Sequence, residues 1–220
     1  ESGMGSYGES GKITATTGSS TFSGDSGSIQ IATGTSNGGN SGLISFATGS
    51  SNEKSAGAII FSVGSTAKGI GGHIKIIGGV SGGHFTGGRL RYSSGVGLQT
   101  SSGGVNIESG NSGAQGTSGA VIISTGSASF GASGSIFLRT GKSTGGSAGS
   151  ILMEVGGAQS GEGGEVMLKA GSSTLSTGGK LVARSGYGVM TSSGSLVLTS
   201  ADAGIAGVSG EIEIRTGTSS

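Results

Sequence analysis

Residues 134–141 read GSIFLRTG, a pattern of glycine, any residue, aliphatic, any residue, apolar, any residue, small residue and glycine. Related copies read GSIQIATG at residues 27–34 and GEIEIRTG at residues 210–217. The opening glycines of the fourteen copies are spaced 15 or 16 residues apart, and they are Gly11, Gly27, Gly42, Gly57, Gly72, Gly88, Gly103, Gly119, Gly134, Gly149, Gly164, Gly179, Gly194 and Gly210. A fixed period of this kind is typical of repeat architectures.

Position two of each copy, counted from the opening glycine as position zero, is aliphatic throughout. These residues are Ile13, Ile29, Ile44, Ile59, Ile74, Leu90, Val105, Val121, Ile136, Ile151, Val166, Leu181, Leu196 and Ile212. Position four is mostly apolar and position six is small. A spacing of two puts these side chains on one face of an extended strand, whereas a helix needs spacings of three and four. We therefore predict one β-strand per repeat, with the position-two residues forming a core ladder.

Gly/Ser-rich return segments, such as SSTFSGDS at residues 19–26, separate the aliphatic segments. They are too short for a crossover helix, and glycine allows the chain to turn. The predicted fold class is all-β: a parallel β-solenoid, or flat β-helix, of about 14 coils of 15–16 residues, stacked about 4.8 Å apart. Apolar residues of the return segments are expected to fill a thin core, and they are Phe22, Leu98, Phe130, Leu175, Met190 and Ile205.

One coil alone is not expected to fold. Burying an Ile or Leu gains roughly 1.5–3 kcal/mol, whereas ordering each residue costs about 1–2 kcal/mol. We therefore expect residues 1–220 to form a single continuous array. The chain begins with Glu1-Ser2-Gly3, which matches the end of an aliphatic segment, and it stops at Ser220 within a return segment. Neither end shows a capping element, so we expect a segment of a longer chain, or ends covered by identical neighbours.

Composition narrows the functional classes. The chain has 53 Gly, no Pro and no Cys, and its net charge is +1. A Gly/Ser-rich composition suits a disordered linker, but regularly placed aliphatic residues favour order. Near-neutral charge argues against general nucleic-acid binding, and the absence of cysteine excludes disulfides and thiolate metal sites. No apolar run approaches the roughly 18 residues of a membrane span.

An apolar row marks the outward face of the later repeats. At position three it comprises Ile122, Phe137, Leu152, Met167, Val182 and Val197. Strands that are apolar on both faces are usually buried on both sides. We therefore interpret the row as an assembly stripe along which two or more copies pack. The alternative is that these residues reflect β-propensity alone.

Four basic residues lie on two adjacent repeats: His73, Lys75, Arg89 and Arg91. Like charges in register repel one another, so a partner is plausible. It would be an acidic polysaccharide, or Glu211 and Glu213 of a neighbouring copy. A solvated basic face without any partner is the simpler alternative.

Catalytic chemistry is not expected. The two histidines, His73 and His84, are not accompanied by clustered ligands, and the acidic residues are scattered. The match to a nucleophile-elbow pattern at residues 145–149 lacks a strand-turn-helix context. We predict no catalytic residue, no metal site and no cofactor. Ice binding would need outward rows of threonine, and Thr14, Thr16 and Thr199 do not form one.

The repeated unit SG-x-I-x-I-x-TG-S-S resembles the Gly/Ser-rich β-solenoid arrays of large secreted proteins, including predicted cell-surface proteins of diatoms and related algae, and bacterial adhesins. The resemblance implies an extracellular or cell-surface location. It also implies a structural role in a filament whose partners are copies of the same chain. The alternative function is an adhesin stalk, or a solenoid that binds polysaccharide or ice.

Overall fold

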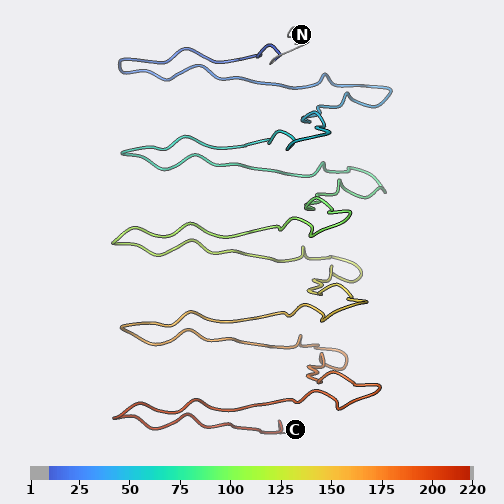
Figure 1. Cartoon of the computed structure of the whole chain (residues 1–220), viewed down its shortest axis with the longest axis vertical. Helices are drawn as coiled ribbons and strands as arrows, with labels where there is room; N and C mark the ends of the chain where they lie inside the picture. Colours follow the sequence, from blue (N-terminus) through green and yellow to red (C-terminus); the bar gives the residue numbers. More distant parts are fainter. Residues whose placement is uncertain (1–9, 219–220) are drawn as a thin grey trace. The chain divides into compact units, whose positions relative to one another are not determined.

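The computed structural model describes residues 10–218 (Figure 1). Between residues 10 and 218 the chain forms no α-helix and no β-strand, and extended stretches alternate with short bends. The partial repeat predicted at Glu1-Ser2-Gly3 and the chain end at Ser220 lie outside the described residues.

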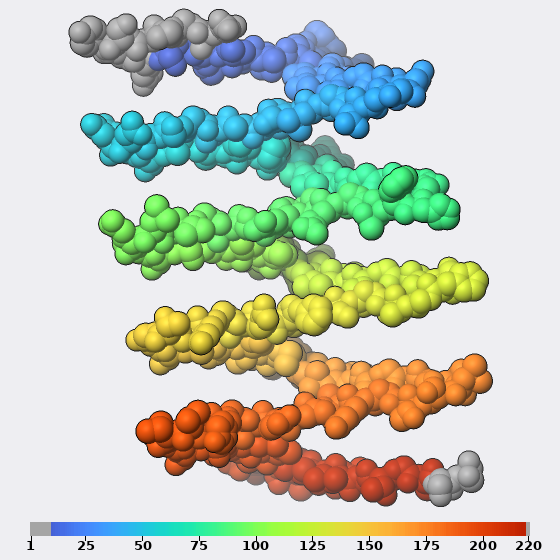
Figure 2. Space-filling view, turned by 90° about the vertical axis from the view of Figure 1, so that its right-hand side faces the viewer, coloured from blue at the N-terminus to red at the C-terminus, as the bar shows by residue number. Residues whose placement is uncertain are grey.

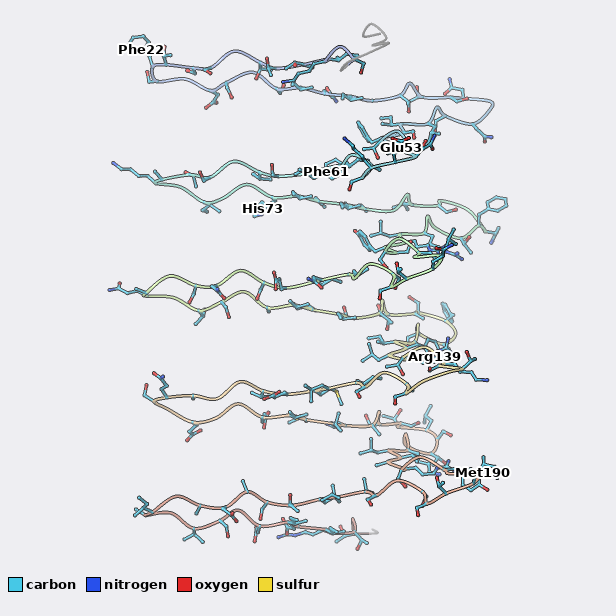
Figure 3. The ribbon with its side chains drawn as sticks, in the orientation of Figure 1. Phe22, Glu53, Phe61, His73, Arg139 and Met190 are labelled. Atoms are coloured by element: carbon cyan, nitrogen blue, oxygen red, sulfur yellow. The ribbon has the colours of Figure 1, made fainter. Side chains whose placement is uncertain are left out.

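The bends follow the sequence period. They fall within the return segments, at residues 22–24, 37–39, 52–54, 67–69, 82–85, 98–100, 114–116, 129–131, 144–146, 159–161, 174–176, 189–191 and 205–206. Phe22 and Met190 mark two of these reversals in the stick view (Figure 3). The prediction that the Gly/Ser-rich stretches turn the chain is therefore confirmed at each of these places.

Each bend brings the next opening glycine back beside the end of the preceding aliphatic segment. The Thr33 hydroxyl donates a hydrogen bond of 3.4 Å to the Gly42 carbonyl across one such junction. A methyl group placed on Gly42 would lie 3.2 Å from Thr33 Cγ2. In other repeats the junction is closed by the backbone, as where the Gly88 N–H donates to the Gly79 carbonyl at 2.8 Å. We call this junction the neck of the return segment.

Serine side chains stabilise several bends from within. Ser51 Oγ accepts a hydrogen bond of 3.1 Å from the Lys54 N–H, three residues further along the chain. The same bond forms between Ser143 and Gly146 at 3.1 Å and between Ser173 and Ser176 at 3.0 Å. Such side-chain bonds to nearby backbone offer the chain an alternative to a sheet ladder.

The predicted parallel β-solenoid is wrong, because the described residues contain no strand that could stack. The return segment was expected to run along the back of a flat coil as a second strand. It instead closes on itself at the neck, as Gly88 and Gly79 show. The following aliphatic segment then starts where the preceding one ends. Consecutive repeats are therefore not laid over one another in register, and the β-helix prediction fails with the solenoid.

No residue of the described part is buried, so the expected thin core is also absent. The return-segment residues predicted to fill it are almost fully exposed, at 91% for Met190 and 99% for Phe130. In the space-filling view the looped return segments are narrow projections no thicker than their two arms (Figure 2). The physical reason is that a loop closed at its own neck carries its apolar tip away from the aliphatic segments.

The chain divides into two units, Glu1–Glu108 and Ser109–Ser220. In the first unit, rings of consecutive repeats meet: Phe46 and Phe61 lie with centroids 6.4 Å apart at an interplanar angle of 86°. This edge-to-face geometry is favourable for aromatic pairs. Among the described residues, two glycines have a positive φ, and both lie in the second unit: Gly131 at 96° and Gly161 at 104°. Each is the last residue of its bend, where a residue with a side chain would be strained.

Amide hydrogen exchange of the dilute, monomeric chain tests this fold. The aliphatic segments should exchange close to the rate of an unstructured chain, because their amides have no ladder partner. The loop-closing amides of Gly88, Gly103, Gly179 and Gly194 should exchange measurably more slowly. Slow exchange throughout the aliphatic segments, with the amide I band of paired strands, would contradict the fold described above.

Candidate functional site

The assembly stripe predicted at position three lies on the surface of the second unit. Leu152 is 81% exposed, more than its neighbours Ile151 at 55% and Met153 at 62%. The other members are exposed as well: Ile122, Phe137, Met167, Val182 and Val197. Except at Val182, each is more exposed than the position-two residue before it. Successive side chains of these extended segments therefore differ in exposure in the alternating manner that the sequence pattern indicates.

The fourteen residues predicted as a core ladder are exposed too, from 43% at Ile44 to 74% at Ile13. Where position three holds a large apolar residue, the position-two residue before it is the less exposed of the two, except at Leu181, but no second layer covers it. The remaining members share this exposure: Ile29, Ile59, Ile74, Leu90, Val105, Val121, Ile136, Ile151, Val166, Leu181, Leu196 and Ile212. The isolated chain thus presents apolar side chains at positions two and three alike.

Two shallow hollows form along the aliphatic segments. One, of about 380 Å³, is lined by Tyr92 from one repeat and by Val105, Asn106 and Ile107 from the next. The other, of about 630 Å³, is lined by the consecutive residues Phe137, Leu138 and Arg139. The first hollow and the Phe46–Phe61 pair both join consecutive repeats, so side chains beyond a neck come within reach of one another.

The predicted basic group lies on either side of one neck. His73 and Lys75 precede the return segment at residues 79–88, and Arg89 and Arg91 follow it. All four side chains are exposed, and His73 is labelled on its extended segment in Figure 3. The hydrogen bond between the Gly88 N–H and the Gly79 carbonyl ties the two arms together. The fold therefore connects these residues through a short loop.

Acid–base pairing is sparse in the described part of the chain. One ion pair forms there, between Arg215 and Glu213, which are two residues apart and both solvent-accessible. Such an exposed pair stabilises a protein by about 1 kcal/mol or less. Glu213 is one of the two carboxylates proposed above as partners of the basic group, and it already has a neighbour of opposite charge.

Residues 10–218 contain no group of three His, Asp or Glu side chains arranged to hold a metal ion. Over the same range no helix is long and apolar enough to cross a bilayer. The expectations of no catalytic residue, no metal and no cofactor stay predictions.

Comparisons of the chain with family models, with curated proteins and with solved structures find no match.

Sequence reasoning missed the residues that shape the loops. A serine two residues after the closing glycine accepts the bend's hydrogen bond at Ser36, Ser51, Ser143 and Ser173. A serine that stands two residues after a glycine is a sequence pattern that could have predicted this turn. A second signal is the motif GxGxxTSSG, which occurs at residues 95–103 and 186–194 and forms the same closed loop twice.

Gly97 and Gly188 hold equivalent places in these two loops and tolerate no side chain. A methyl group on Gly97 would lie 2.7 Å from the Thr100 carbonyl oxygen and would also strike that of Ser101. On Gly188 it would lie 2.7 Å from the Thr191 oxygen. The close backbone approach therefore requires glycine at both places.

We expect Gly97→Ala to open its loop at a cost of about 1–3 kcal/mol, the usual penalty of forced overpacking. The protection of the Gly103 amide, measured by hydrogen exchange, should then disappear. Gly95→Ala is the matched control, because a methyl group there meets nothing within 4 Å. If both variants changed the Gly103 amide equally, the steric explanation would be refuted.

Proposed function

We propose that this chain is a structural protein of an extracellular filament, assembled side by side, and also end to end, from copies of itself. The proposal rests on one observation: every large apolar side chain of the described residues is exposed. Exposed apolar patches much beyond a few hundred Å² are uncommon on proteins that act as monomers. Contact between copies would remove these side chains from water.

The energetics favour assembly over folding alone. Each aliphatic side chain that becomes buried gains roughly 1.5–3 kcal/mol. A single chain collects little of this gain, because its closed return segments leave the aliphatic segments uncovered. A neighbouring copy can cover many segments at once. The translational and rotational entropy lost on association is then lost only once for all of these contacts.

Repetition multiplies each weak contact. The aliphatic segment recurs with the same spacing of 15 or 16 residues, so a copy that matches one segment also matches those beside it. Linked contacts of this kind raise the overall affinity far above that of a single contact. Neighbours shifted by a whole repeat find equivalent partners, which supports growth into a filament.

The assembly stripe is the surface we assign to the side-by-side contact. A charged row accompanies it at position five, with Arg139, Glu154, Lys169 and Arg184. Charges at an interface contribute more to alignment of the partners than to affinity. The apolar row would thus supply the attraction, and the charged row would favour one alignment of neighbouring copies.

Replacing Leu152 and Met167 with Glu should weaken assembly. Each substitution puts a carboxylate where the proposal buries an apolar side chain. We expect a loss of at least about 1.4 kcal/mol per contact, which is a tenfold rise in the dissociation constant. Analytical ultracentrifugation across a concentration series would measure it, and electron microscopy would show whether parallel bundles persist.

The matched control is Ser147→Glu with Ser160→Glu, which adds the same charge at polar return-segment positions near the same repeats. This control should assemble like the unmodified chain. Undiminished assembly of the Leu152/Met167 variant would refute the stripe. A chain that stays monomeric at all concentrations, without any substitution, would refute the filament.

A further inference from the structure

Residues 54–107 form a continuous tract that contains no Asp or Glu. The tract is bounded by Glu53 and Glu108, and its cations are Lys54, Lys68, Lys75, Arg89 and Arg91, together with His73 and His84. The net charge of the whole chain is close to zero, so it does not reveal that these cations are separated along the sequence from the acidic residues. The positive charge belongs to a local surface of the first unit and not to the molecule as a whole.

The neck at residues 79–88 joins the middle of this tract. Beside the closing hydrogen bond, a methyl group on Gly78 would lie 2.7 Å from the Gly88 carbonyl oxygen, so the two arms touch through their glycines. Lys75 stands three residues before this contact, and Arg89 and Arg91 stand one and three residues after it. A cation-bearing arm therefore lies on each side of the same loop.

These cations occupy alternate positions of the extended arms. His73 and Lys75 are at positions one and three of their segment, as are Arg89 and Arg91 of the next. Side chains two residues apart in an extended chain are about 7 Å from each other and share one side. The basic side chains thus form short rows separate from the aliphatic positions two and four.

Among the described residues of the first unit, no acidic side chain forms an ion pair with this group. The side chains are exposed, and the one ion pair of the described residues lies elsewhere, between Arg215 and Glu213. Repulsion among neighbouring like charges is relieved by an anionic partner. An extended polyanion binds a row of cations more tightly than a single small anion does, because its linked charges make several contacts at once.

An aromatic ring and an amide adjoin the basic rows. Tyr92 directly follows Arg91 and lines the hollow of about 380 Å³ together with Val105, Asn106 and Ile107. At the bend of residues 82–85, Phe85 is 85% exposed beside His84. An apolar lining with a few polar groups that fix orientation is the usual composition of a small-molecule site. A sugar ring offers both an apolar face and hydroxyl groups to such a surface.

We propose that residues 72–107 bind an acidic polysaccharide, whose carboxylate or sulfate groups meet Lys75, Arg89 and Arg91 and one of whose sugar rings rests against Tyr92. A second copy of the chain suits this surface less well. Its acidic pair offers two carboxylates, of which Glu213 already has Arg215 beside it, and neither carboxylate would occupy the hollow. The site uses no residue of the assembly stripe, so it extends the proposed function to a second partner.

The test uses the full chain and its Lys75→Gln/Arg89→Gln/Arg91→Gln variant. Calorimetric titration with polygalacturonate and with dextran sulfate should show binding that falls as salt rises. Neutral dextran should not bind. The triple variant should bind the acidic polymers at least about tenfold more weakly, since three charge-assisted contacts are lost. Tyr92→Ala should weaken binding as well, whereas Tyr187→Ala should not.

The matched control is Lys142→Gln/Lys180→Gln/Arg215→Gln, which removes the same charge from the second unit, outside the charged row assigned to assembly. Equal weakening by this control would overturn the site. Equally tight binding of polyglutamate would show that the site recognises negative charge alone. That result would overturn the assignment to polysaccharide in favour of an acidic segment of a second copy. Assembly is measured separately, so loss of polysaccharide binding with assembly retained would leave the filament proposal standing.

Discussion

Closure of each return segment at its own neck is the constraint on which the rest of this structure depends. The ends of such a segment are close in sequence, so bringing them together costs little chain entropy. Glycine at the junction lets the two backbones approach, as at Gly79 and Gly88, and serine hydroxyls hold the bend from inside. Once the loop is closed, the next aliphatic segment must begin beside the end of the last.

This local closure explains both the exposure and the regularity of the chain. An aliphatic segment that starts at a neck forms no backbone ladder with a neighbouring segment, so it is extended but unpaired. Its apolar side chains face solvent on both sides. The contacts that do form join consecutive repeats just beyond a neck, as the Phe46–Phe61 pair and the hollow beside Tyr92 illustrate.

The sequence predicted the period, the positions of the bends and the alternation along each segment. It did not predict the fold, because a spacing of two describes any extended chain, whether or not it is paired. Whether the extended segments pair depends on the return segments. There the serine turn at Ser51 and the close backbone approach at Gly97 favour a closed loop over a second strand. The alternating pattern predicts that Leu152 and Arg91 are exposed. It does not predict the hollow beside Tyr92, because that hollow forms only where two repeats meet across a neck.

The independence of the necks has a consequence for how such a chain can vary. Each return segment is closed by groups that lie within about ten residues of one another, as between Gly95 and Gly103. Gain or loss of one whole repeat would therefore leave every other loop with its own bonds. A gene that encodes this protein can lengthen or shorten it by duplication or deletion of a single unit without a compensating change elsewhere.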